Sequence, residues 1–129
     1  MLLAFLTFCK NFFDMKFTES ITDNRIYKQM YYRAKSIVCR NVVVYLRKNR
    51  LGINRLGLTC SKTVGKAVQR NRAKRIIKEA YRLNENRFAA GYDFVIVARV
   101  RAKDAKLSDI EKDLLYAASR LSFLKEDVK

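Results

Sequence analysis

The residues with the clearest chemical potential are the Lys and Arg side chains in the middle of the chain. Residues 24–78 hold 16 Lys and Arg and no Asp or Glu, within a chain whose net charge is +16. Ammonium and guanidinium groups bind phosphate oxygens, and a guanidinium can do so through two parallel hydrogen bonds. A long stretch of one charge sign therefore predicts a surface that binds a polyanion.

Side chains that could hydrolyse a phosphodiester are missing from the same stretch. A protein that does this uses clustered carboxylates that hold metal ions, or His side chains as acid and base. The chain has no His, and Cys9, Cys39 and Cys60 are widely spaced, so the cysteines are interpreted as small apolar residues rather than nucleophiles. Asp109 and Asp113 share a helix face and are interpreted as solvated surface. We therefore assign no catalytic residue, no metal ligand and no cofactor to the protein.

Hydrophobic periodicity and turn residues predict the elements that position the cations. They are a helix over 24–34, strands over 41–47 and 55–61, a helix over 65–88, a strand over 93–99 and a final helix. The first two strands, joined by a polar loop, are interpreted as a hairpin. Asp23 or Thr22 is expected to cap the first helix, and Ser108 with Glu111 forms a capping box for the last. The order αββαβα, or αβββαβα, predicts an α+β two-layer sandwich.

The length of 129 residues suits one domain. We assign residues 15–129 to that domain and residues 1–14 to an N-terminal extension, and either Met1 or Met15 fits as the start. The apolar run over 1–8 lacks the basic flank and cleavage site of a secretory signal. No apolar run reaches the roughly 18 residues of a membrane helix. The three cysteines are odd in number, and their spacing suggests no disulfide framework, so we expect a cytoplasmic protein. We also expect that it binds no membrane.

The central helix is expected to be amphipathic in an unusual way. At about 100° per residue, one arc is apolar: Ala73, Ile76, Ile77, Ala80, Tyr81 and Asn84. The other is cationic: Arg72, Lys74, Arg75, Lys78 and Arg82. Lys66 and Arg70 point toward the apolar side in the first turns. A solvated helix face normally mixes charge signs, whereas Glu79 is the one acid against eight Lys and Arg between 62 and 82. This imbalance favours phosphate binding over a merely solvated face.

The segment GLTCSKTVGKAVQRNRAKRIIKEAYR, residues 57–82, resembles the signature of the bacterial ribonuclease P protein subunit. The resemblance runs from about Lys16 to Leu124 and rests on the combined spacing of Ser61-Lys62, Gly65, Ala67-Val68, Arg70-Asn71-Arg72 and Lys74-Arg75. Two positions depart from the family pattern. Lys66 stands where Asn is common, and Ala34 where a Gly often ends the first helix.

The resemblance implies a subunit that binds a large catalytic RNA and assists endonucleolytic removal of the 5′ leader from precursor tRNA. The residues it implies for RNA-subunit binding are Lys62, Lys66, Arg70, Asn71, Arg72, Lys74 and Arg75. The leader would lie in a cleft lined by Tyr27, Tyr31 and Tyr45, with Phe17 as a further candidate, where bases stack on aromatic rings. The RNA would supply the chemistry and hold the Mg²⁺. The family fold also implies a left-handed βαβ crossover around the central helix, like that of a ribosomal small-subunit protein domain.

Two alternatives stay open at this point. The tyrosines could simply be buried against the sheet, as isolated Tyr pairs usually are. The chain could also be a structural or ribosomal RNA-binding protein without a catalytic partner. Such a protein would share the charge and the α+β fold but would not need an aromatic cleft.

Overall fold

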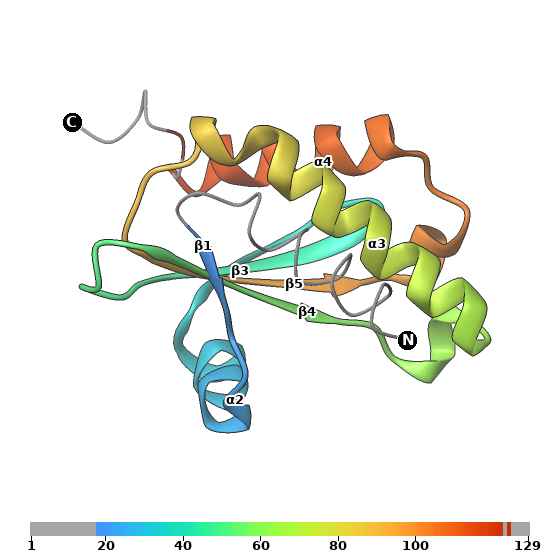
Figure 1. The fold of residues 1–129 in the computed structure, drawn as a ribbon, viewed down its shortest axis with the longest axis horizontal. Helices are drawn as coiled ribbons and strands as arrows, with labels where there is room; N and C mark the ends of the chain where they lie inside the picture. The colour runs from blue at the N-terminus through green and yellow to red at the C-terminus, as the bar shows by residue number, and fades with distance from the viewer. Residues whose placement is uncertain (1–17, 123, 125–129) are drawn as a thin grey trace, which may run out of the picture.

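Five strands form one mixed sheet with helices on both faces in a computed structural model that describes residues 18–122 and 124 (Figure 1). The strands are β1 (Thr18–Ser20), β2 (Lys35–Val38), β3 (Val42–Lys48), β4 (Asn54–Thr59) and β5 (Tyr92–Ala98). The helices are α2 (Asn24–Arg33), α3 (Ala67–Asn84) and α4 (Leu107–Arg120), with 3₁₀ turns η1 (Lys62–Val64), η2 (Glu85–Arg87) and η3 (Val100–Lys103). The predicted extension over 1–14 and Phe17 lie outside the described residues.

The last strand in the sequence, β5, lies at the centre of the sheet. The strand order is β1-β4-β5-β3-β2, and β5 pairs in parallel with β4 and antiparallel with β3. The predicted hairpin of the second and third elements is therefore wrong, because β5 lies between β3 and β4. Phe94 and Ile96 point to one face of β5 and Val95 to the other, and all three are fully buried. A strand that is apolar on both faces needs cover on both, which a central position provides.

The α+β class is confirmed, and the differences are local. β1 and β2 were not placed by periodicity because each has only three or four residues. β4, α3 and β5 form the predicted parallel βαβ unit. Asp23 caps α2 as expected, since its carboxylate accepts a hydrogen bond from the Arg25 N–H at 2.9 Å. The predicted capping box of α4 is wrong: the helix begins after Lys106, whose N–H donates to Asp109 Oδ2 at 3.0 Å.

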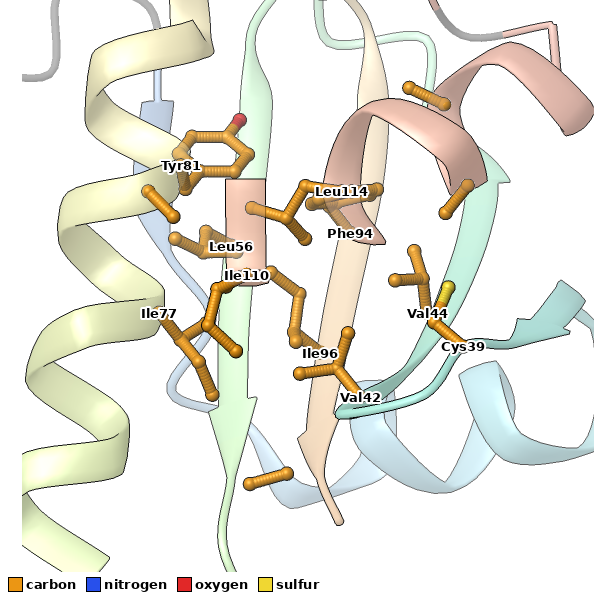
Figure 2. Close-up of a cluster of buried hydrophobic side chains, with 14 of the residues drawn as sticks. Cys39, Val42, Val44, Leu56, Ile77, Tyr81, Phe94, Ile96, Ile110 and Leu114 are labelled. Atoms are coloured by element: carbon orange, nitrogen blue, oxygen red, sulfur yellow. The ribbon is translucent and has the colours of Figure 1, made fainter. Parts of the chain in front are cut away.

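The main core lies between the sheet and the pair α3 and α4 (Figure 2). Figure 2 shows Ile77 and Tyr81 of α3 and Ile110 and Leu114 of α4 pointing onto β4, β5 and β3. The apolar arc predicted for α3 is confirmed, since Ala73, Ile77, Ala80, Tyr81 and Asn84 are buried. Each large side chain buried here contributes about 1.5–3 kcal/mol, so the position of α3 on the sheet is strongly specified.

Asp109, Asp113 and Cys39 have structural roles on the side of the sheet that α3 and α4 cover. Asp113, interpreted from sequence as solvated, accepts a hydrogen bond from the Asn41 N–H at 2.8 Å, and Asp109 caps α4. Cys39 is buried as expected. Burial raises the pKa of its thiol to about 11, and the Asp113 carboxylate adds to the shift. The thiol therefore stays protonated at neutral pH and is a poor nucleophile.

The opposite face of the sheet is covered by α2 over only part of its area. Ile21, Met30 of α2 and Val95 of β5 form a second, smaller apolar cluster. Partly buried Tyr27 and Tyr45 pack against it. None of the helices in the described part of the chain is long and apolar enough to cross a membrane.

Candidate nucleic-acid interface

One side of α3 carries a row of cations. Arg70, Lys74 and Lys78 follow at intervals of four residues, so their side chains lie on one side of the helix. The exposed residues next to this row extend it toward solvent and onto the preceding turn, η1. Together they form what we call the cationic surface: Lys62, Lys66, Arg70, Asn71, Lys74, Arg75 and Lys78.

Arg70 lies where the cationic surface meets the end of β4. Its side chain is half-buried, as predicted, whereas Lys66 is exposed at the N-cap of α3. Burial raises the pKa of the neighbouring Cys60 thiol, and the charges of Lys74 and Arg70 oppose that shift. Among the described residues, the Arg70 guanidinium makes no hydrogen bond or ion pair, and its Nε is buried. Arg70 is thus held by packing, and its accessible N–H donors remain available to a ligand.

The cations of this surface repel one another. Burial lowers the pKa of Lys78, and the nearby Lys74 ammonium lowers it further. The one carboxylate of α3, Glu79, forms an ion pair with Arg82 one turn later. The cationic surface therefore has an excess of positive charge that a polyanion would relieve.

Arg72, the third residue of the Arg-Asn-Arg triplet, points away from the cationic surface. Its Nη1 donates a hydrogen bond to the Lys103 carbonyl oxygen at 2.6 Å, and its Nη2 donates to the Ala105 carbonyl oxygen at 3.1 Å. These carbonyls lie at the end of η3 and in the turn before α4, where backbone acceptors lack helical partners. Two of the five N–H donors of Arg72 thus fasten α3 to the start of α4.

An aromatic surface lies on the other face of the sheet, beside α2. The Tyr31 and Tyr45 rings meet edge to face with their centroids 5.2 Å apart. The Tyr31 hydroxyl shares a hydrogen bond of 3.1 Å with the Thr59 hydroxyl, and Tyr31 is 42% exposed. We call Tyr31, Tyr45 and Thr59 the aromatic surface. Because the sheet separates it from α3, the two surfaces face opposite sides of the molecule rather than lying side by side.

A row of strand residues missed by sequence reasoning extends the aromatic surface across the sheet. Val38 pairs with Val43, Val43 with Val97, and Val97 with Thr59. With neighbouring strands about 4.8 Å apart, this row is about 14 Å long. Val38 is 63% exposed, while Val43 and Val97 are half-buried. The alternation within each strand indicates which residues share a face, but only the strand order joins them into one row.

Tyr27 has a more structural position than the other two tyrosines. It is half-buried, and its hydroxyl donates to the Ile21 carbonyl oxygen at 3.3 Å. Its ring lies against Gly57 of β4 so closely that a Cβ atom at position 57 would be 2.7 Å from the Tyr27 hydroxyl oxygen. The glycine therefore allows α2 to approach the sheet, and Tyr27 supports the aromatic surface from beneath.

Gly57→Ala is expected to destabilise the fold by about 1–3 kcal/mol, because the added methyl must push the Tyr27 ring off β4. Urea unfolding would measure this. The double variant Gly57→Ala with Tyr27→Ala should lose less stability than the two single variants lose in total, because removing the ring also removes the clash. Additive losses, or an unchanged stability of Gly57→Ala, would contradict this role of the glycine.

A buried carboxylate ties three strands together on the same face. Asp93 of β5 is fully buried and accepts hydrogen bonds from Arg55 Nε at 2.6 Å, Arg47 Nη2 at 2.8 Å and Asn49 Nδ2 at 3.0 Å. Arg47 Nη1 also donates to Gln29 Oε1 of α2 at 3.1 Å. The Asp93 cluster (Asp93, Arg47, Arg55 and Asn49) therefore connects the sheet to the helix that carries Tyr31.

A basic α+β fold with a cationic helix on one face and exposed aromatic rings on the other defines an RNA-binding protein. The family model described as Ribonuclease P matches residues 15–122. The chain belongs to the ribonuclease P protein family. It is thus a protein component of an endoribonuclease complex that acts in tRNA processing, and its partner is the ribonuclease P RNA.

Curated relatives and solved structures agree with this assignment. The ribonuclease P protein component of Clostridioides difficile (strain 630) is 41% identical over 102 residues, which cover 78% of this chain and 90% of the relative. That of Clostridium botulinum (strain Langeland) is 48% identical over 96 residues, covering 74% and 86%. The Staphylococcus aureus RNase P protein structure aligns with a TM-score of 0.73 at 30% identity, covering 82% of this chain and 97% of that one. The Thermotoga maritima protein aligns with a TM-score of 0.69 at 27% identity, covering 76% and 93%.

Proposed function

We propose that the cationic surface binds the ribonuclease P RNA while the aromatic surface holds the single-stranded 5′ leader of precursor tRNA. The observation that carries the proposal is the row of cations Arg70, Lys74 and Lys78 along α3, whose one acid pairs with Arg82. Burial lowers the pKa of Lys78, and the nearby Lys74 ammonium lowers it further. Phosphates of a folded RNA supply the missing negative charge. Since the aromatic surface is on the opposite face of the sheet, both RNAs can be bound at once.

Leader binding through stacking suits the geometry of the second surface. Tyr31 is partly exposed, and its edge-to-face contact with Tyr45 fixes the orientation of both rings. Bases that stack on such rings gain affinity with little sequence preference. The row from Val38 to Thr59 would give further apolar contact to an extended strand. Tyr27 contributes indirectly by packing on Gly57.

We further propose that the RNA supplies the hydrolytic chemistry and holds its Mg²⁺. The carboxylates of Asp93, Asp109 and Asp113 already accept hydrogen bonds from other parts of the chain. Within the described residues, no group of three or more His, Cys, Asp or Glu could hold a metal ion. The protein would screen phosphate repulsion and position the leader for the RNA to cleave.

Adding the protein is expected to stimulate cleavage of precursor tRNA by its RNA partner about tenfold or more at low Mg²⁺, because protein cations replace part of the counterions. The measurement is the cleavage rate with and without protein across a Mg²⁺ series. The stimulation should shrink as Mg²⁺ rises. An RNA that cleaves equally well without the protein at low Mg²⁺ would contradict the proposal.

Tyr31→Ala is expected to weaken binding of precursor tRNA to the assembled complex about tenfold, since one base–ring stack contributes about 1–3 kcal/mol. Mature tRNA, which lacks the leader, should bind as before. Tyr31→Phe keeps the ring and should retain most of the affinity. The adjacent Tyr32, which is 90% exposed, provides the matched control Tyr32→Ala. Equal losses for precursor and mature tRNA would argue against the leader surface.

A further inference from the structure

A polar pocket of about 320 Å³ lies between the turn that joins β2 to β3, the turn η3 and the start of α4. It is distinct from both surfaces described above. Its lining residues are Arg40, Asn41, Arg101, Asp104, Ala105 and Asp109. None of them belongs to the residues that the sequence pattern singled out for RNA binding.

Asn41 is the most informative residue of this pocket because it is buried and yet incompletely paired. It is 7% exposed. Its backbone N–H donates to Asp113 Oδ2 at 2.8 Å, and its backbone carbonyl accepts from the Arg99 N–H at 2.9 Å. Its side-chain amide, in contrast, has no hydrogen-bond partner among the described residues. Among the described residues, Arg70 Nε is the one side-chain polar atom that is both shielded from solvent and without a partner. The Asn41 amide therefore reaches solvent in the pocket, where its donors and its acceptor are available to a ligand.

The walls of the pocket add guanidinium donors and carboxylate acceptors. Within the part of the chain that the structure describes, the side chains of Arg40, Arg101 and Asp104 make no hydrogen bond or ion pair. Asp109 uses one carboxylate oxygen for the Lys106 N–H, which leaves the other. The two guanidinium groups and the two carboxylates sum to no net charge, so the pocket offers a simple phosphate no excess of positive charge. The mixed set matches a nucleobase, whose edge carries amino and carbonyl groups and whose face can stack on guanidinium.

The pocket is also joined to the Arg-Asn-Arg triplet. Arg72 holds the Lys103 and Ala105 carbonyls, which lie on either side of Asp104. One residue of the triplet therefore fixes a pocket wall while its neighbours Arg70 and Asn71 belong to the cationic surface. The loop that forms this wall is therefore attached to the same helix that carries the cationic surface.

We propose that this pocket binds a single unpaired nucleobase of the RNA that docks on α3, with the Asn41 amide reading the edge of the base. The proposal rests on the function proposed above, because it takes its ligand from the same RNA. A bidentate amide–base contact distinguishes one base from another. The chain would thus add base recognition to a surface that otherwise contacts phosphates.

The direct test is an NMR titration of the full ¹⁵N-labelled chain with the four ribonucleoside 5′-monophosphates, and with ribose 5-phosphate as the probe that lacks a base. The Asn41 side-chain amide and the Asp104 and Ala105 backbone signals should shift with at least one nucleotide and not with ribose 5-phosphate. Asn41→Ala should lower the affinity for that nucleotide about tenfold. Asn86→Ala, at an exposed asparagine in η2, is the matched control.

Asp104→Ala tests the pocket without the risk of misfolding that the Asn41 variant carries. Asp104 is exposed, and its side chain makes no hydrogen bond or ion pair with the rest of the described residues. This variant should also weaken nucleotide binding. Equal shifts with ribose 5-phosphate, no shifts at these residues, or unaltered binding by both variants would overturn the pocket proposal.

The binding of the ribonuclease P RNA separates this proposal from the one it rests on. Asn41→Ala should weaken RNA binding about tenfold without changing its salt dependence, since no phosphate contact is lost. If cationic-surface variants lose RNA binding while nucleotides leave the pocket signals unmoved, the pocket proposal alone fails. If nucleotides bind the pocket but cationic-surface variants bind RNA normally, the proposed function fails instead.

Discussion

Replacing Arg70, Lys74 and Arg75 together by glutamine is expected to weaken binding of the ribonuclease P RNA about 100-fold at physiological salt. Each of these cations is placed to neutralise one phosphate, and each such contact adds close to one unit to the slope of log affinity against log salt. The variant should therefore lower the slope by about two to three units. Equilibrium binding across a salt series measures both the affinity and the slope.

A matched control removes the same charge from other parts of the molecule. Arg87, Lys112 and Arg120 are exposed cations in η2 and on α4, away from the cationic surface. Their replacement by glutamine changes the net charge equally but should reduce the affinity only a few-fold through the long-range field. If both triple variants lost affinity and slope to the same extent, total charge rather than the position of α3 would determine binding.

Asp93→Asn is expected to lower the free energy of unfolding by about 3 kcal/mol, because it leaves two arginines close together without their shared counterion. The Arg47 and Arg55 side chains are only 26% and 22% exposed, so water compensates them poorly. Urea unfolding gives the measurement. Glu19→Gln, which removes an exposed carboxylate near Arg55, should change stability by no more than about 0.5 kcal/mol. Comparable losses in the two variants would contradict a special role for the buried carboxylate.

The same carboxylate should make stability depend on pH in acid. Burial alone would raise the pKa of Asp93, but the hydrogen bonds from Arg55, Arg47 and Asn49 outweigh it and hold the pKa below its usual value. The ionised group therefore stabilises the fold at pH above about 4, the pKa of an unfolded aspartate. This contribution is lost as the pH falls through the lower folded pKa. The Asn variant should show a flatter decline of stability over that range.

The amphipathic pattern of α3 made much of the first surface predictable from sequence. Ala73, Ile77 and Tyr81 recur at helical spacing and are buried, so the cations between them had to lie outward. Arg72 differs because its direction depends on where η3 and α4 pack, which no local pattern contains. Its assignment as an RNA contact stays a prediction, whereas its hydrogen bonds to the Lys103 and Ala105 carbonyl oxygens give it a structural role within the protein.

The sheet and the second surface were less predictable because they depend on strand order. Arg47, Arg55 and Asp93 come from three strands, and only the insertion of β5 between β3 and β4 brings them together. Tyr27 and Tyr31 lie four residues apart and so share a helix face, but this spacing does not distinguish the ring that packs on Gly57 from the ring that meets Thr59. The Asn41 amide gave no sequence signal at all, since its place in the pocket arises only where the turn between β2 and β3 meets η3 and α4.

The central position of β5 has a consequence for biosynthesis. Before Tyr92–Ala98 is made, β1 can pair only with β4 and β2 only with β3, so the nascent chain holds two separate strand pairs without a shared core. At about 5–20 residues per second, the stretch over 24–78 emerges from the ribosome seconds before the strand that joins the two pairs. During that interval the most basic part of the protein has been made but does not yet share one folded core. We therefore expect cooperative folding to begin only after β5 is synthesised.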